Sequence, residues 1–189
     1  ALDARIGESL AGERHARTRF DDFRPATLGL ARATGAEAGA THSRDLALPA
    51  GLSSDDALAA LAILALRLGE GGGAPGDHVD LAWADATTAR GDALHLSGWV
   101  PVRLSAAGDV AAARAELAEE IARARRLGGF PADLPARLAG TAPARPAIGL
   151  CPDPAAGLVP GTLLTLGAGD GVARLWADAT RLSETAFAL

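Results

Sequence analysis

The 189-residue sequence predicts an α/β (α+β) fold, in which a mixed β-sheet of about five strands is backed by helices. Short alternating or apolar runs, which are typical of strands, are interspersed with longer runs whose apolar residues repeat at helical spacing. This intermixed order favours a sheet covered by helices over a sandwich or a bundle. A chain of this length also suffices for one sizeable core, so we expect one domain.

The first 43 residues are expected to form a helical and loop leader ahead of the main lobe, residues 44–189. From Leu2 to about Arg19, charged and small residues alternate with isolated apolar ones, as in a surface helix. Pro25 lies in the stretch that breaks this pattern. Residues 31–43 are small and polar, so we expect a loop there.

A short strand and a buried helix are predicted next. Residues 44–49 alternate like a strand and end at a proline. Ser53 or Ser54 then offers an N-cap, and two aspartates follow in the first turn, where the helix dipole favours negative charge. The helix up to Leu68 is apolar on nearly every side, so we expect it to be sandwiched between other elements.

Two further strands are predicted at 78–84 and 93–104, after a glycine-rich loop. The second contains Pro101, which cannot donate a ladder hydrogen bond. We therefore expect an edge position or a bulge for this strand.

The rest of the chain alternates between helices and strands. Asp109 is the expected N-cap of a long amphipathic helix running to about Leu127, in which Glu119 is placed to pair with Arg123. The remaining predicted elements are a helical turn at 134–138, strands at 147–151, 158–166 and 171–177, and a helix beginning at Ser183.

Charge and composition narrow the expected partners. The net charge is −5, the pI is near 5.3, and no block of like charge occurs, so we expect neither nucleic acid nor a membrane as a partner. The most apolar stretch, 57–68, is about a dozen residues, whereas a membrane span needs roughly 20. With one cysteine and no leader pattern, we expect a cytoplasmic location. Because the sequence contains no methionine, we expect it to be part of a longer chain.

Two glycine-rich stretches resemble nucleotide-binding loops only superficially. Glu70–Gly73 is not followed by Gly-Lys-Ser/Thr or by a helix start, so a flexible connection is the better interpretation. Gly167–Gly171 lies between two predicted strands, whereas a dinucleotide fingerprint needs a strand and then a helix. We predict a hairpin turn there.

The histidines do not form a metal-binding pattern. His15, His42, His78 and His95 are not three or four residues from one another or from Cys151, so no two of them would share one helical face. We therefore predict no metal site and no directly bound cofactor.

No nucleophile with a recognisable base occurs either. No Gly-x-Ser-x-Gly elbow is present, and Ser97, two residues after His95, would only share a strand face with it. Cys151 precedes a proline at a strand end, which favours a small buried hydrophobe. We accordingly predict no catalytic residue.

Acidic and aromatic residues have simpler interpretations. Asp77 and Asp80 could be imagined as an acid/base pair, but solvated loop charges are the better interpretation, because nothing in the sequence shows that one is desolvated relative to the other. Trp83, Trp99 and Trp176 all fall in predicted strands. Core packing therefore suits them better than a ligand cage.

The order of segments resembles the C-terminal lobe of the condensation domain of nonribosomal peptide synthetases, which has a chloramphenicol acetyltransferase-like fold. The resemblance covers roughly residues 44–189 and rests on segment order. Four stretches carry it: 46–52 with the helix ending at Leu66-Arg67-Leu68-Gly69; Val79 to Ala84; Ser97-Gly98-Trp99-Val100-Pro101-Val102-Arg103-Leu104 with the helix after Asp109, similar to Gly-x-Phe-Val-Asn-Thr-x-x-x-Arg; and Gly171 to Leu189 with Leu175-Trp176-Ala177-Asp178 before Ser183.

The departures from the family pattern bear on activity. The catalytic signature of the family, His-His-x-x-x-Asp-Gly, belongs to the N-terminal lobe and does not occur in the sequence. The Val-Asn-Thr core of the later motif is also missing, and Pro101 stands close to where the amide would be. The resemblance therefore implies a half domain, apparently truncated, that does not catalyse condensation by itself.

Three functions remain open from the sequence. The first is a non-catalytic partial condensation-like domain that serves as a structural and docking platform for an adjacent adenylation or carrier domain; phosphopantetheine would then enter only on a partner carrier protein. The second is one lobe of an active, peptide-bond-forming condensation domain whose catalytic half lies outside this sequence. The third is an unrelated small-molecule binding module, which would show a deep apolar pocket with convergent polar groups.

Overall fold

A computed structural model describes residues 2–28, 37–69, 74, 76–88, 96–105, 109–138 and 145–188, with only the backbone described for 2–9. Its elements in chain order are α1 (Leu2–Phe20), β1 (Thr41–Leu46), α2 (Ser54–Leu68), β2 (His78–Trp83), β3 (Val100–Ser105), α3 (Val110–Leu127), α4 (Leu134–Leu138), β4 (Ile148–Cys151), β5 (Leu164–Gly169), β6 (Val172–Asp178) and α5 (Glu184–Ala188).

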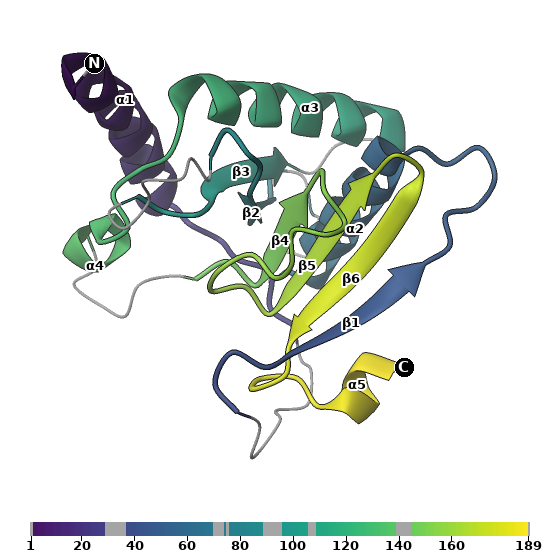
Figure 1. Cartoon of the computed structure of the whole chain (residues 1–189). Coiled ribbons are helices and arrows are strands. Elements are labelled where there is room, and N and C mark those ends of the chain that lie inside the picture. The colour runs from purple at the N-terminus through teal and green to yellow at the C-terminus, as the bar shows by residue number, and fades with distance from the viewer. Residues whose placement is uncertain are drawn as a thin grey trace.

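The six strands form one mixed sheet in the order β1-β6-β5-β4-β2-β3 (Figure 1). The pairs β2–β4 and β4–β5 are parallel, and the others are antiparallel. The predicted α/β class with a mixed sheet is confirmed, with six strands where about five were expected, because every strand-like segment joins the same sheet. β3, which contains Pro101, lies at one edge, as its missing N–H donor predicted.

The two faces of the sheet differ in what covers them. One face is packed by α2 and α3, and the main core lies there, with Val79 and Leu81 of β2 and Leu150 of β4 fully buried. In Figure 1 this face points away from the viewer, and α2 lies behind the strands. No described helix packs on the middle of the opposite face, which we call the helix-free face. Strand alternation places Asp80, Arg103 and Trp176 on it.

Glycines let a loop cross the helix-free face closely. A Cβ at Gly167 of β5 would lie 2.6 Å from the carbonyl oxygen of Asp153, and one at Gly149 of β4 would lie 2.9 Å from Val159 Cβ. The loop 152–161 therefore packs directly on β4 and β5, and any larger side chain at these glycines would push it away.

Helix α2 begins as predicted but is less enclosed than predicted. Ser53 is the N-cap, in a reciprocal capping box with Asp56. Small residues such as Ala59 and Ala62 bury one side against the sheet, whereas Leu64 and Leu68 are about half exposed. The expectation of a sandwiched helix is therefore wrong, since no described element covers the outer side of α2.

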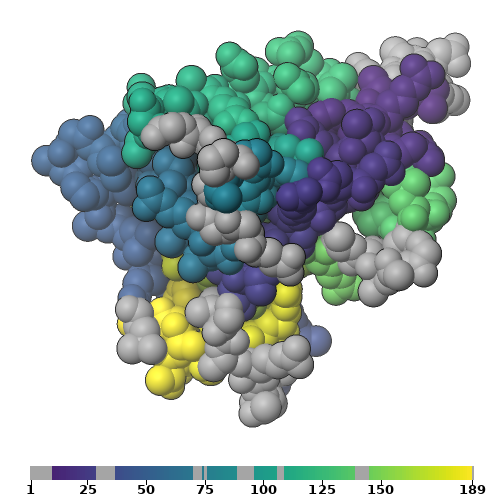
Figure 2. Space-filling model, turned by 180° about the vertical axis from the view of Figure 1, so that it is seen from behind, coloured from purple at the N-terminus to yellow at the C-terminus, as the bar shows by residue number. Residues whose placement is uncertain are grey.

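The N-terminal helix is confirmed and packs beside α3. α1 contacts α3, α4 and β3, and Figure 2 shows α1 (purple) next to α3 (green) on the surface. Phe20 at its end meets Trp99 and Phe130 in edge-to-face contacts with centroids 6.1 and 5.4 Å apart. The division into a leader and a lobe at residue 43 stays a prediction.

Three strand boundaries differ from the prediction. The strand predicted at 93–104 begins only at Val100, because Ser97 Oγ bonds to the N–H and the carbonyl of Trp99 just before it, and residues 93–95 lie outside the described part of the chain. β1 begins at Thr41 and ends at Leu46, so the loop predicted up to residue 43 ends earlier, because Thr41–Ser43 pair with β6. β5 spans Leu164–Gly169 and not 158–166, because Pro160 and Gly161, with φ +85°, turn the chain before the strand. The turn itself lies at Asp170 and Gly171, both with positive φ, which confirms a hairpin after Gly169.

Within the described part of the chain, no helix combines the length and the apolar character that crossing a membrane requires.

Candidate functional site

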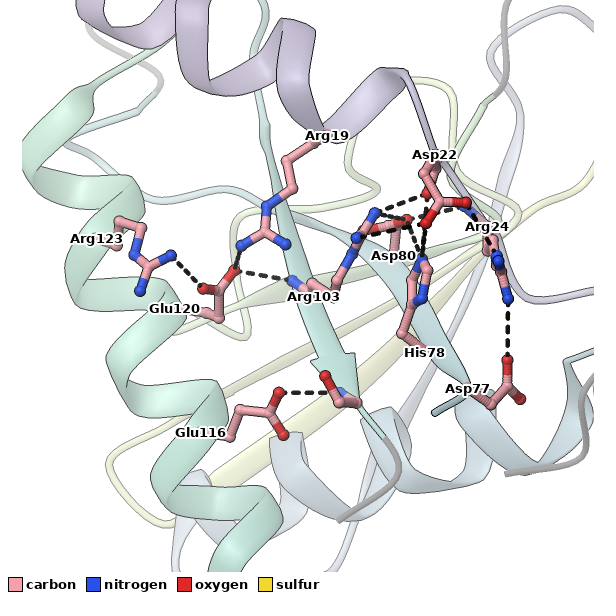
Figure 3. Close-up of polar contacts among 11 residues, drawn as sticks. Arg19, Asp22, Arg24, Asp77, His78, Asp80, Arg103, Glu116, Glu120 and Arg123 are labelled. Carbon is pink, nitrogen blue, oxygen red and sulfur yellow. Dashed lines mark hydrogen bonds and ion pairs between the residues drawn. The ribbon is translucent and has the colours of Figure 1, made fainter. Parts of the chain in front are cut away.

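Charged side chains gather at the junction of α1, β2, β3 and α3 (Figure 3). We call this group the polar cluster; its members are Arg19, Asp22, Arg24, Asp77, His78, Asp80, Arg103, Glu116, Glu120 and Arg123. A second polar group lies at the carboxyl end of β2, around Asp85.

Asp80 is the buried centre of the polar cluster. Its side chain is fully buried and accepts two hydrogen bonds from Arg103, from Nε at 2.9 Å and from Nη2 at 3.0 Å. It also accepts one from the backbone N–H of Arg24 at 2.8 Å. The interpretation of Asp80 as a solvated loop charge is wrong. The antiparallel register of β2 and β3 places Asp80 opposite Arg103, and their shared face is closed off by the chain around Arg24.

Asp22 and His78 extend this network towards the surface. The backbone carbonyl of Asp22 accepts from Arg103 Nη2 at 2.7 Å, and His78 Nε2 lies 3.1 Å from the same oxygen. The ring nitrogen is 3.6 Å from the carboxylates of both Asp22 and Asp80. Asp77 is also buried and lies 3.7 Å from Arg24 Nη1, so its interpretation as a solvated charge is wrong too.

Glu120 connects α1 and α3 to the edge of the sheet. Its carboxylate accepts from Arg19 of α1 and from the backbone N–H of Arg103 at 3.3 Å, and it pairs with Arg123 at 3.2 Å. Arg123 therefore pairs with Glu120, not with Glu119 as expected, because Glu120 is on the buried side of α3. Next to this group, burial and the neighbouring arginines lower the pKa of His15.

The polar cluster fastens the N-terminal segment to the sheet. Every buried side-chain nitrogen or oxygen among the described residues has a hydrogen-bond partner, so the carboxylates are neutralised within the fold. No described serine or cysteine side chain hydrogen-bonds to His78, the one imidazole between two carboxylates. Among the residues that the structure describes, the cluster contains no pair of nucleophile and base, and its hydrogen bonds are those of a structural ion network.

The second group, the Asp85 cluster, lies at the carboxyl end of β2 and comprises Trp83, Asp85, Thr87, Thr88 and Arg125. Asp85 Oδ2 accepts from Trp83 Nε1 at 2.9 Å and from Arg125 Nε at 2.7 Å, while Oδ1 accepts from the N–H of Thr87 at 2.8 Å. Burial raises the pKa of Asp85, but hydrogen bonds from Thr87, Arg125 and Trp83 outweigh burial and hold the pKa far below its usual range. The carboxylate therefore stays ionised and fixes the Arg125 guanidinium over the Trp83 ring, 5.3 Å from its centroid.

A cavity of about 180 Å³, the α2–α3 groove, opens beside the Asp85 cluster. It lies between α3, the first turns of α2 and the ends of β2 and β4, and its lining includes Leu58, Trp83, Leu117, Ile121, Arg125 and Pro152. Small-molecule sites usually measure about 300–1,000 Å³. This groove is therefore smaller than the deep pocket that a small-molecule binding module would show.

A larger hollow of about 480 Å³ lies near the start of β1. It is lined by Thr41, Leu158, Asp178, Thr180 and small residues before β1. The Asp178 carboxylate already accepts from the N–H and hydroxyl groups of Thr180, so the lining offers few groups for a ligand.

The other residues singled out in the sequence are dispersed. Ser97 Oγ donates to the backbone carbonyl of Trp99 at 2.7 Å, and His42 stacks on Phe187. Cys151 is buried as predicted, and burial raises the pKa of its thiol, which disfavours the thiolate. His95 and Glu70–Gly73 lie outside the described residues.

Two tryptophans confirm the expected core role, and the third does not. Trp83 and Trp99 are buried, whereas Trp176 lies half-buried on the helix-free face, where Arg174 stacks on it at 5.5 Å from the ring centroid. In the described part of the chain, no three histidine, cysteine or acidic side chains come together as metal ligands would.

No protein-family model and no curated protein matches the chain. Solved structures do. The starter condensation domain of the rhizomide synthetase RzmA, as a mutant, matches with a TM-score of 0.62 at 17% identity over 99% of this chain and 50% of that one. Its complex with C8-CoA matches with a TM-score of 0.65 at 17% identity, over 96% and 49%. The complex of the X-domain and OxyB from teicoplanin biosynthesis matches with a TM-score of 0.59 at 18% identity, over 94% and 49%.

These likenesses show the fold. The chain spans about half the length of the structures that it matches, and nearly all of the chain takes part. The half-domain architecture expected from the segment order, a condensation-domain-like lobe consistent with the C-terminal one, is therefore confirmed as a fold.

Proposed function

We propose that this lobe acts by binding a neighbouring protein domain of a nonribosomal peptide synthetase, and not by catalysing acyl transfer itself. One observation carries the proposal: the charged groups that are most deeply buried, around Asp80 and Glu120, are neutralised within the fold and fasten its segments together. The sequence also lacks the histidine signature of condensation domains. The buried charges stabilise the lobe itself. Binding of another domain would therefore use its outer surface.

The likeness to the X-domain supports a docking role. That domain has the same fold as this chain and was solved in a complex with OxyB. For this chain we propose an adjacent adenylation or carrier domain as the partner. Phosphopantetheine would then be present only on the carrier protein.

A second candidate function is one lobe of an active condensation domain. The observation that favours it is the extent of the structural match, because nearly the whole chain matches about half of a starter condensation domain. That domain was solved in complex with C8-CoA. In this case a second lobe outside this sequence would supply the histidine.

Gel filtration and calorimetry with the purified chain and the adjacent adenylation and carrier domains of the same polypeptide would test the proposal. We expect a stable complex with one of these domains. Absence of binding to both, together with condensation activity once an upstream lobe carrying the histidine signature is restored, would overturn the docking role in favour of the half-enzyme.

A further inference from the structure

The two edges of the sheet differ in what their backbone groups pair with. β3 forms one edge and β1 forms the other, as Figure 1 shows. An edge strand directs the N–H and carbonyl groups of alternate residues away from the sheet, where another strand can pair with them. The partners of these groups therefore show whether an edge can bind a further strand.

At the β3 edge, the chain itself closes every outward-pointing N–H position. Pro101 has no N–H group to offer. The N–H of Arg103 donates to Glu120 at 3.3 Å, and the N–H of Ser105 donates to Glu116 at 3.0 Å (Figure 3). The two glutamates are four residues apart, about 6 Å along α3, which is close to the spacing of alternate strand residues, about 6.5 Å. The carboxylates of α3 thus take the place of a neighbouring strand.

At the β1 edge, the outward-pointing groups are free. The N–H of Ala179 donates to the carbonyl of Ala40, which makes these two a hydrogen-bonded pair in the register of β1 and β6. Because such pairs alternate along an antiparallel ladder, Thr41, Ser43 and Asp45 direct their backbone groups away from β6. All three residues are exposed, and their N–H and carbonyl groups have no partner among the residues that the structure describes.

The charged side chains of β1 are held by the chain itself. Charges on an edge strand commonly hinder the addition of a further strand. Here Arg44 donates to the carbonyl of Ala188 at 3.0 Å and lies over the ring of Phe187, 5.9 Å from its centroid. Asp45, on the helix-free face, pairs with Arg174 of β6. Both charges are thus engaged on the two faces of the sheet, to either side of the outward-pointing backbone groups.

The spacing of these groups selects an extended backbone as their partner. Residues 41–45 present three N–H and three carbonyl groups over about 14 Å, at 3.4 Å per residue. An antiparallel strand of about five residues offers the complementary groups at the same spacing. Because strand addition uses the backbone, it tolerates many sequences but excludes proline at the paired positions.

We propose that the β1 edge binds an extended segment of the neighbouring domain, which adds to the sheet as a further strand antiparallel to β1. Thr41, Ser43 and Asp45 each donate one backbone hydrogen bond to this segment and accept one from it. The proposal rests on the proposed docking function, and it names the surface and the form of the partner.

Amide hydrogen exchange in the complex tests the edge directly. The probe is the adjacent adenylation or carrier domain that binds in gel filtration. We expect the amides of Thr41, Ser43 and Asp45 to exchange at least tenfold more slowly in the complex than in the free chain. The amides of His42 and Arg44 already bond to β6, so their exchange should change less. Docking through side chains alone would not protect every second amide.

Two matched proline variants separate the open edge from the closed one. Ser43→Pro removes the central N–H of the β1 edge, which does not bond to β6, and β3 already accommodates Pro101 in a position of this kind. Ser105→Pro makes the same change at an outward-pointing position of β3. We expect Ser43→Pro to weaken binding of the neighbouring domain at least tenfold, and Ser105→Pro and Ser43→Ala to leave it unchanged. Urea unfolding checks that each variant is folded.

Each other outcome overturns a separate part. If the neighbouring domain binds and the three amides exchange as in the free chain, strand addition is wrong and the docking function stands. If neither domain binds, the docking function is wrong, and strand addition falls with it. Slower exchange of the same amides in the isolated chain at rising concentration would make a second copy the occupant and overturn the proposal.

Discussion

The polar cluster and the Asp85 cluster contain the same kinds of side chain, but they differ in how fully the arginine beside the buried carboxylate is enclosed. Around Asp80, Arg103 donates from both Nε and Nη2, and Asp22 and His78 close the remaining side. Around Asp85, the carboxylate is surrounded just as fully, but Arg125 contributes only its Nε. The Arg103 side chain is therefore only 18% exposed, whereas that of Arg125 is 47% exposed.

The largest expected effect is at the centre of the polar cluster. Asp80→Ala leaves the N–H of Arg24 without its acceptor, and the part-buried Arg103 guanidinium keeps only the backbone carbonyl of Asp22. We expect a loss of about 3–5 kcal/mol in the free energy of unfolding, because the change breaks an ion pair whose carboxylate is fully buried. Urea unfolding measures it, with Asp22→Asn at the exposed edge as the milder control. A loss below about 1 kcal/mol would mean that the cluster does not fasten the N-terminal segment.

A smaller loss is expected at the Asp85 cluster. Asp85→Ala removes the acceptor for Trp83 Nε1, Arg125 Nε and the N–H of Thr87. We expect a cost of about 2–3 kcal/mol, less than at Asp80, because the released Arg125 can turn to water. Urea unfolding measures this cost, as for Asp80→Ala. An unchanged free energy of unfolding would mean that the hydrogen bonds of Asp85 do not stabilise the fold.

The pH dependence of stability should distinguish the two carboxylates further. The pKa of Asp85 is lowered in the folded state, so its stabilising contribution is fully present above the unfolded pKa of about 3.9 and is lost as the pH falls through the lower folded value. We expect the unaltered chain to lose stability more steeply than Asp85→Asn between pH 4 and pH 2. Urea midpoints across this range measure the difference. Parallel curves would contradict the lowered pKa.

The smallest effect is expected at the rim of the polar cluster. Arg123 pairs with Glu120, but its side chain is 48% exposed and Glu120 keeps Arg19 and the N–H of Arg103 as partners. We expect Arg123→Ala to cost at most about 1 kcal/mol, as exposed ion pairs do. Thermal unfolding at low and high salt would check this. A loss as large as that of Asp80→Ala would show that the cluster has no distinct centre.

Much of the fold could be predicted from the sequence because it depends on local patterns. The N-cap at Ser53, the edge position of Pro101 and the hairpin after Gly169 each follow from the chemistry of a few adjacent residues. The exposed side of α2 at Leu64 could not be predicted, since periodicity shows which residues are apolar but not whether an element covers them.

The candidate sites were harder to predict than the fold. Asp80 and Arg103 are 23 residues apart, and Arg125 is 40 residues from Asp85. Alternation in the two strands placed Asp80 and Arg103 on definite faces, so the register was the missing piece of information. No local signal in the sequence connects Asp85 to Arg125.

The sequence by itself determined the α/β class, the order of the elements, and the absence of the condensation signature. These properties depend on residue type and on spacing along the chain. Only the tertiary structure decided that Asp77 and Asp80 are buried and neutralised, and that Arg114 and Arg125 flank one pocket. The reason is that burial and pairing depend on the strand register and on how the helices pack, and distant segments fix both together.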